Sequence, residues 1–151
     1  MPLTLYTIGF AGWKAEDFFE TLKAHKIRLL VDVRLNNTSQ LAGFTKRDDL
    51  AYFLRAICKA EYRHEPLLAP TKEILGAYKR TEIDWGEYGV AFSDLLRERR
   101  VQRVVKRKSL RKNTVFMCSE PTPEKCHRRL VVEYLASRWR GAEVVHLVRL
   151  P

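Results

Sequence analysis

The chain of 151 residues contains no uninterrupted apolar stretch of about 18 residues, which a membrane-spanning helix would need. Its three cysteines are too few, and odd in number, for the disulfide framework of a small secreted domain. The first residues, MPLTLYTIGFAG, carry neither the basic segment nor the cleavage site of a secretory signal. No repeat, low-complexity tract or long linker divides the sequence. These absences predict one domain over residues 1–151, cytoplasmic and without a membrane partner.

Positive charge is in excess, because 28 Lys and Arg residues stand against 18 Asp and Glu residues and give a net charge of +10. Such a balance favours an anionic ligand, with nucleic acid or a nucleotide among the candidates. The other interpretation is a surface crossed by ion pairs, as in heat-adapted proteins. Hydrophobic residues make up 46% of the sequence, which is enough for a core under either interpretation.

Short apolar stretches alternate with amphipathic ones along the chain. The apolar stretches are expected to form strands at residues 3–8, 27–33, 62–64, 113–118 and 143–148. The amphipathic stretches are expected to form helices at residues 14–26, 47–59, 72–79, 88–100 and 123–139. This order predicts an α/β fold, a single domain with a mainly parallel sheet of about five strands and helices on both faces. Trp85 and Gly86 are expected to separate the third helix from the fourth, and Cys58 is expected in the core.

Residues 97–112 form a strongly basic stretch, with nine Lys or Arg among sixteen residues. Val101, Val104 and Val105 keep an apolar stripe within it, so one interpretation is a helix with a solvated basic face. The other interpretation is a track for the phosphates of nucleic acid. No aromatic residue interleaves the stretch, which argues against stacking on single-stranded bases there.

Polar residues follow the predicted strands at the points where the strands end. In a parallel sheet these ends meet at one edge, and ligands bind beyond that edge. We therefore expect a polar site there, formed by Gly9, Asp32, Arg34, His64, Cys118, Ser119, Glu120 and His146.

Asp32 ends the most apolar of the predicted strands, and Arg34 follows two residues later, on the same side if the strand continues. A carboxylate buried in such a strand needs a partner. The pair therefore has two interpretations. It is either a structural ion pair that holds the loop or a pair that binds substrate and moves protons.

The most informative segment runs from Cys118 to Arg128, where a strand leads into a helix. Thr122 as N-cap and Pro123 at the first helical position predict that this helix starts at Pro123. A helix start attracts anions and lowers the pKa of a nearby thiol. Arg128 would add positive charge to an anion site at that helix start.

Three kinds of chemistry fit this segment. Phosphate or phosphodiester chemistry would use His127 and Glu120 as acid and base. Thiol chemistry would use Cys118 or Cys126 as the nucleophile, with His127 as its base. A metal site would use the two cysteines, His127 and His64, but the tight C-x-x-C pair of a structural zinc site is missing, so no metal site is expected. Against all three stands a purely structural role, with Cys118 in the core and His127 on a helix surface.

Several sequence motifs occur together over nearly the whole chain. They are Thr7-Ile8-Gly9-Phe10, Val31-Asp32-Val33-Arg34, the segment from Tyr62 to Thr71, Met117-Cys118-Ser119-Glu120, Cys126-His127-Arg128-Arg129 and Val144-Val145-His146. With this combination the sequence resembles the DUF 488 family, a domain of unknown function found in bacteria and archaea. The resemblance implies an intracellular α/β domain and brings no established activity. The family pattern has a Pro soon after the Asp-x-Arg motif, whereas here Arg34 is followed by LNNTS.

The residues that match the recurring family motifs are those already singled out at the sheet edge and the helix start. They are Gly9, Asp32, Arg34, Glu120, Cys126, His127, Arg128 and His146.

The leading hypothesis from the sequence is an enzyme that acts on a phosphate-bearing substrate, a nucleotide or nucleic acid. The expected anion- and substrate-binding residues are Arg34, Arg128, Gly9, His64 and His146. The expected proton-transfer residues are His127, Glu120 and Asp32, and the candidate thiols are Cys118 and Cys126. No cofactor is indicated. The rival is a non-enzymatic nucleic-acid-binding protein that uses the basic stretch, and a third hypothesis is a scaffold whose polar site only stabilises its loops.

Overall fold

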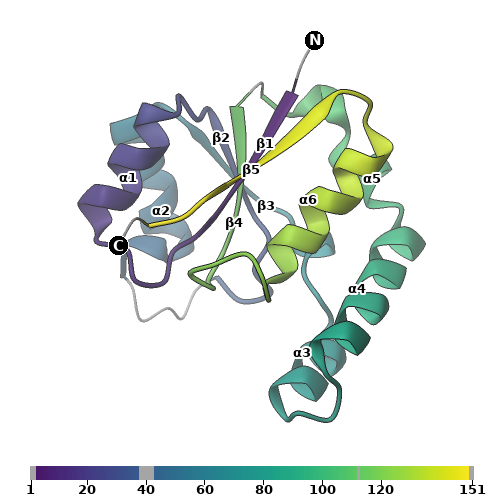
Figure 1. Ribbon diagram of the computed structural model, residues 1–151. Coiled ribbons are helices and arrows are strands. Elements are labelled where there is room, and N and C mark those ends of the chain that lie inside the picture. The colour runs from purple at the N-terminus through teal and green to yellow at the C-terminus, as the bar shows by residue number, and fades with distance from the viewer. Residues whose placement is uncertain (1–2, 38–42, 112, 150–151) are drawn as a thin grey trace.

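A computed structural model describes residues 3–37, 43–111 and 113–149 of the chain (Figure 1). At its centre lies a five-stranded sheet in which every pairing is parallel, with the strand order β3-β2-β4-β1-β5. The strands are β1 (Leu3–Gly9), β2 (Leu29–Asp32), β3 (Glu61–His64), β4 (Asn113–Cys118) and β5 (Ala142–Leu147). The α/β fold predicted from the alternation of apolar and amphipathic stretches is confirmed.

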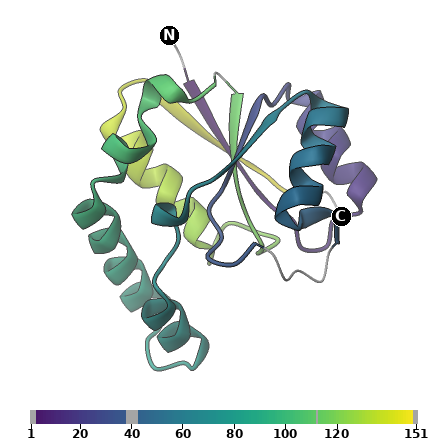
Figure 2. The same ribbon diagram turned by 180° about the vertical axis from the view of Figure 1, so that it is seen from behind.

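Helices cover both faces of this sheet. They are α1 (Ala15–Ala24), α2 (Arg47–Phe53), α3 (Lys72–Lys79), α4 (Trp85–Arg99), α5 (Val101–Val105) and α6 (His127–Arg138), and a π-helical turn (Leu54–Cys58) extends α2. Figures 1 and 2 show α1 and α2 on one face, with α4, α5 and α6 on the other. Right-handed crossovers explain this division. From β1 to β3 the chain adds strands toward one edge of the sheet, and from β4 to β5 it moves toward the opposite edge, so the helices of the two halves lie on opposite faces.

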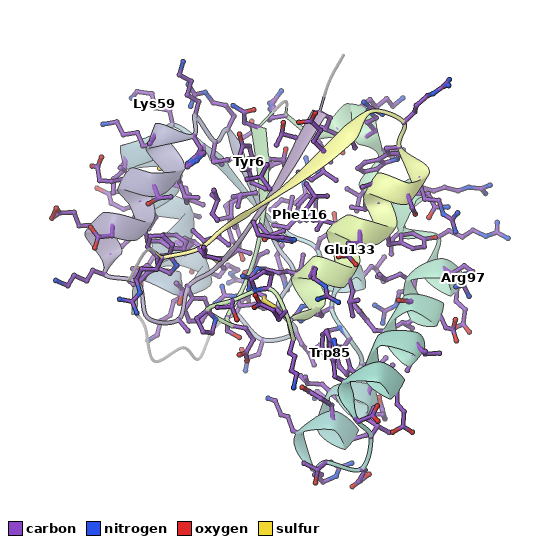
Figure 3. The ribbon with its side chains drawn as sticks, viewed as in Figure 1. Tyr6, Lys59, Trp85, Arg97, Phe116 and Glu133 are labelled. Carbon is purple, nitrogen blue, oxygen red and sulfur yellow. A yellow bond between two sulfur atoms is a disulfide. The ribbon has the colours of Figure 1, made fainter. Side chains whose placement is uncertain are left out.

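The strands bury side chains on both faces. Along β2, Leu29 and Val31 pack against α4, α5 and α6, whereas Leu30 packs against α1 and α2. Phe116 on β4 lies in the first of these cores, at the middle of the sheet in Figure 3. Cys58 is buried in the second core, as predicted. No helix in the described ranges is both long and apolar enough to cross a membrane.

The helix predicted to start at Pro123 begins instead at His127, with Cys126 as its extended N-cap residue. The Thr122-Pro123 signal was therefore wrong about the boundary. Tertiary contacts of the first helical residues decide it: His127 bonds to the carbonyl oxygen of Val33, and Arg128 is fully buried beneath the helix. Residues 119–126 consequently form a turn-rich loop that follows β4.

The fourth helix starts earlier than predicted, at Trp85 rather than Tyr88. Asp84 caps it and forms a capping box with Glu87, in which each side chain accepts a hydrogen bond from the other residue's backbone N–H. The expectation that Trp85 and Gly86 separate two helices is therefore wrong, because both residues lie in the first turn of α4.

The basic stretch is not one helix with a single basic face. α4 ends at Arg99, Arg100 adopts a left-handed conformation with φ of 51°, and α5 follows as a separate short helix. Val101 and Val105 are buried but Val104 is exposed, so the expected apolar stripe is broken. The stretch ends beside the start of β3, where Arg111 pairs with Glu61 at 2.9 Å, and its last residue, 112, lies outside the described residues.

Candidate functional site

A cavity of about 790 Å³ opens at the carboxyl edge of the sheet, between the ends of β2 and β4. These two strands are neighbours whose following helices, α2 and α6, lie on opposite faces, and such a point is where doubly wound sheets bind ligands. α3 and the first turns of α4 project beyond the sheet and form the outer wall (Figures 1 and 2). The cavity is lined by Arg34, Leu35, Asn36, Asn37, Lys72, Leu75, Tyr78, Lys79, Trp85, Tyr88, Cys118, Ser119, Glu120, Lys125, Cys126 and His127.

Two cysteines lie at the base of the cavity, where β4 ends and where α6 begins. Cys118 and Cys126 are both buried, and the structure places their sulfur atoms in direct contact as a disulfide. Their Cα atoms are 7.8 Å apart. The sulfur atom of Cys118 also receives a long contact from Arg128, with 3.7 Å between Nη1 and Sγ.

His127 completes this cluster and has a defined tautomer. Its Nε2 lies 2.7 Å from the carbonyl oxygen of Val33, and since a carbonyl oxygen only accepts, Nε2 carries the proton. Nδ1 is then the nitrogen with a free lone pair. Burial of the ring, with a smaller contribution from the charge of Arg128, lowers the pKa of His127 to about 4. The ring is therefore neutral near pH 7, and Nδ1 can accept a proton, a hydrogen bond or a metal ion.

Arg34 lines the cavity from the β2 side and is held by Asp32. Its Nε and Nη2 donate to the two carboxylate oxygens of Asp32 at 2.8 Å each, and Nη2 also donates to the carbonyl oxygen of Thr45. Nη1, by contrast, is shielded from solvent and has no hydrogen-bond partner in the described part of the chain. It is therefore a donor whose hydrogen bond the described residues do not supply.

Asp32 itself does not line the cavity. It is fully buried and also accepts hydrogen bonds from the backbone N–H of Arg34 and from the hydroxyl of Tyr62 at 2.6 Å. Burial and the neighbouring carboxylate raise the pKa of Tyr62, so the phenol stays protonated and donates. His64 supports the same loop, since its Nε2 donates to the carbonyl oxygen of Arg34 at 2.9 Å. These contacts make Asp32 and His64 supports of Arg34.

A second group of predicted residues lies on the other side of β4, away from the cavity. Arg128 is fully buried; it donates to the carbonyl oxygen of Glu120 at 2.6 Å and to Oγ1 of Thr7 at 3.3 Å. Nδ1 of His146 is 2.6 Å from the same hydroxyl of Thr7. Burial lowers the pKa of Arg128 to about 10 and also lowers the pKa of His146. The two arginines expected to hold one anion are thus separated, and only Arg34 lines the cavity.

Gly9 belongs to this second group because it permits a close approach of two loops. A Cβ at this position would lie 1.4 Å from the carbonyl oxygen of Glu120 and 2.6 Å from Nη1 of Arg128. Glycine is therefore required by the packing between the ends of β1 and β4.

The wall formed by α3 and α4 was not foreseen from the sequence. It brings the exposed ammonium groups of Lys72 and Lys79 to the cavity, together with aromatic rings. Trp85 stacks on Tyr88 with ring centres 5.2 Å apart and an interplanar angle of 17°, and Tyr78 packs against Tyr88 at 5.0 Å. The seven-residue spacing of the two lysines, which puts them on one face of α3, was the available signal.

Charge in the cavity is strongly one-sided. Arg34, Lys72, Lys79 and Lys125 line it, and Glu120 is its one carboxylate among the described lining residues. The arrangement combines cations, an aromatic wall and a buried cysteine–histidine cluster. Such a combination suits a ligand that has both an anionic group and a planar apolar part.

No curated protein and no solved structure matches the chain. The family model described as Domain of unknown function DUF488 matches residues 14–135, which run from just before α1 into α6 and include every residue that lines the cavity. Because this match spans well over half of the 151 residues, the chain belongs to the DUF488 family.

Proposed function

We propose that the protein is an enzyme that acts on a phosphate-bearing substrate, a nucleotide or a nucleotide unit of nucleic acid, bound in the cavity between β2 and β4. The observation that carries the proposal is the composition of that cavity, in which four cationic side chains and one carboxylate meet an aromatic wall. Cationic side chains neutralise phosphate oxygens, and stacking on an aromatic ring accepts any base because every base has a π-face.

The phosphate is assigned to the cationic side of the cavity. Lys72 and Lys79 contribute mobile ammonium groups from α3, whereas Arg34 is held rigidly by Asp32 and has an unpartnered Nη1. A planar guanidinium with a free donor suits a phosphate oxygen. Asp32 thus acts in this proposal by positioning Arg34, since its own oxygens are occupied.

The base is assigned to the aromatic side. Trp85, labelled in Figure 3, is partly exposed at the start of α4. Tyr88 stacks on its ring, and the guanidinium of Arg129 lies 6.0 Å from the centre of that ring. Stacking of one base on such a ring contributes about 1–3 kcal/mol.

Proton transfer is assigned to His127 and Glu120, which both line the cavity. His127 is neutral near pH 7 and its Nδ1 has a free lone pair, which can accept a hydrogen bond from a substrate hydroxyl or a water molecule and take its proton during reaction. Its pKa of about 4 makes it a weaker base than an ordinary histidine. Glu120 is an exposed carboxylate among the residues that line the cavity. The Cys118–Cys126 pair lies next to His127 at the base of the cavity.

The test is a binding titration of the full-length protein with a nucleoside monophosphate and with the matching nucleoside, followed by tryptophan fluorescence and calorimetry at low salt. Tight binding of the monophosphate only is expected. The double variant Lys72→Gln/Lys79→Gln should weaken this binding at least tenfold, because it removes two phosphate-neutralising charges.

The matched control is Arg103→Gln/Lys106→Gln, which removes two exposed charges from the basic stretch. It should leave binding within about twofold of the unmodified protein. Arg103 and Lys106 precede β4, whereas the cavity lies past its carboxyl end, and a six-residue strand is about 20 Å long, more than the Debye length of about 10 Å. Equal loss in both variants, or loss only in the control, would contradict the cavity site and favour nucleic-acid binding by the basic stretch. Absence of any nucleotide binding at low salt would contradict both.

A further inference from the structure

We propose that Cys118, Cys126 and His127, with both thiols reduced, form a binding site for one divalent transition-metal ion of the zinc class at the base of the cavity. The inference rests on the proposed function and deepens it, because a metal ion there would adjoin the bound substrate. It assigns two protein thiolates and one imidazole as ligands, and it leaves the fourth position of a tetrahedral ion for water or substrate.

The first observation is the convergence of three ligand atoms. One donor atom from each of the three residues lies within 4.8 Å of the other two, and no other such group of three occurs among the described residues. Sulfur and nitrogen donors around a tetrahedral zinc ion lie about 3.5–3.8 Å from one another, as follows from metal–ligand distances of about 2.0–2.3 Å. Side-chain adjustments of about an ångström therefore suffice to enclose an ion.

The absence of a C-x-x-C pair does not weigh against this site, although it led the sequence to predict none. That spacing is needed when both cysteines come from one tight turn. Here Cys118 comes from the end of β4 and Cys126 from the start of α6, so the fold brings them together across an eight-residue separation.

The second observation is the spacing of the main chain. The Cα atoms of Cys118 and Cys126 are 7.8 Å apart, whereas disulfide-bonded cysteines have Cα atoms about 4.4–6.8 Å apart. The backbone thus holds these residues farther apart than a direct sulfur–sulfur bond requires. A bridging ion lengthens the path from one Sγ to the other and fits the wider backbone spacing.

The third observation is the hydrogen bond that fixes His127. Metal-binding histidines commonly donate their second ring N–H to a carbonyl oxygen or a carboxylate, which leaves the other nitrogen as the ligand. His127 has this arrangement, with Nε2 donating to Val33 and Nδ1 left with its lone pair.

The guanidinium beside Cys118 also supports a metal site. Nη1 of Arg128 lies 3.7 Å from Sγ of Cys118, so the guanidinium can donate a hydrogen bond to this sulfur when it is a ligand. A bound ion would lower the pKa of a water molecule in its fourth position. With His127 occupied as a ligand, Glu120 would remain as the proton carrier of the cavity.

The test uses the full-length protein, reduced, freed of metal and titrated anaerobically with Co²⁺. One equivalent is expected to bind and to produce the thiolate-to-cobalt charge-transfer band and the intense visible bands of a tetrahedral site, and Zn²⁺ should displace it. Cys126→Ser should abolish the charge-transfer intensity of one thiolate and weaken binding at least tenfold. The matched control is Cys58→Ser, which changes the buried cysteine outside the cluster and should bind as the unmodified protein does.

A second measurement needs no variant and so does not depend on folding of the mutants. Zn²⁺ should slow alkylation of Cys118 and Cys126 by iodoacetamide at least tenfold in the unmodified protein and leave Cys58 unchanged. Failure to bind a stoichiometric ion, equal binding by Cys126→Ser, or no protection from alkylation would overturn the metal site. Nucleotide binding is measured separately, so a metal site without nucleotide binding would refute the proposed function alone, and the reverse result would refute the metal site alone.

Discussion

Two crevices lie side by side at the carboxyl edge of the sheet, one between β1 and β4 and the other between β2 and β4. In the first, the chain fills the space with its own groups: the N–H of Phe10 bonds to the carbonyl of Cys118, that of Ala11 bonds to Ser119, and Arg128 lies buried alongside. The second opens into a cavity of about 790 Å³. Polar residues at a sheet edge are therefore not enough to mark a ligand site. What distinguishes the two is that the chain's own groups fill the first, whereas the second is left open as a cavity.

The two buried arginines, Arg128 and Arg34, illustrate this difference between the crevices. Arg128 donates to Glu120 and Thr7 and belongs to the closed crevice. Arg34 is fixed by Asp32 and lines the open cavity. Each arginine keeps one buried donor nitrogen without a partner among the described residues, so the difference lies in their access to the cavity. In sequence the two residues look equally suited to hold an anion.

Gly9→Ala, in the closed crevice, is expected to lower the stability of the protein more than any other change proposed here. The new methyl group would lie 1.4 Å from a backbone oxygen, which cannot move away as the end of a side chain can. We expect loss of more than about 4 kcal/mol of unfolding free energy, or failure to fold, measured by urea denaturation.

The control for this change is Gly89→Ala in α4, where an added Cβ meets no atom within 4 Å. It should stabilise the protein by about 0.5–1 kcal/mol, because alanine favours a helix over glycine. If Gly9→Ala were as stable as Gly89→Ala, the close packing of β1 against the loop after β4 would be refuted.

The next largest loss of stability is expected at the open cavity for Arg34→Met, because this change leaves the carboxylate of Asp32 buried without its cation. The expected cost is about 3 kcal/mol. In the double variant Asp32→Asn/Arg34→Met the cost should fall below the sum of the two single costs, because neither charge remains. Additive costs in urea denaturation would show that the two side chains do not stabilise each other.

The smallest expected effect concerns His146 in the closed crevice. Burial and the charge of Arg128 lower its pKa in the folded state, so the unfolded chain binds the proton more readily. Stability should accordingly fall as the pH drops below about 6.5, the ordinary pKa of histidine. His146→Gln should flatten this decline between pH 7 and pH 5 by on the order of 0.5 kcal/mol. An unchanged slope in paired denaturation curves would remove His146 from the pH response.

Much of the fold was predictable because the strands are buried on both faces. β4 runs over residues 113–118, as the apolar pattern indicated, and the sheet edge it ends at is where the cavity opens. The start of α6 was not predictable from the local signal at Thr122 and Pro123, because contacts of His127 with β2's loop and the burial of Arg128 decide it. Those contacts join residues about ninety positions apart or more, which no local pattern records.

The candidate site was predictable in part for the same reason. Strand ends placed Arg34, Cys118 and Glu120 at the right edge, and Cys126 and His127 followed in the next loop. Which residues face the cavity depends on how the loops close, and the sequence could not separate the open crevice from the filled one. The aromatic and lysine wall was missed because it lies on helices inserted between β3 and β4, remote in sequence from any strand end.

The wall formed by α3 and the start of α4 can be substituted separately from the sheet edge that forms the rest of the cavity. α3 and the start of α4 form a unit with its own caps, at Thr71 and at Asp84, and Arg99 ties the far end of α4 to the carbonyl oxygens of Leu67 and Ala69. Substitutions on its inner face alter the size and charge of what the cavity accepts without touching the sheet or the cysteine–histidine cluster. A change confined to this helical pair would therefore reshape the cavity and leave the carboxyl edge of the sheet as it is.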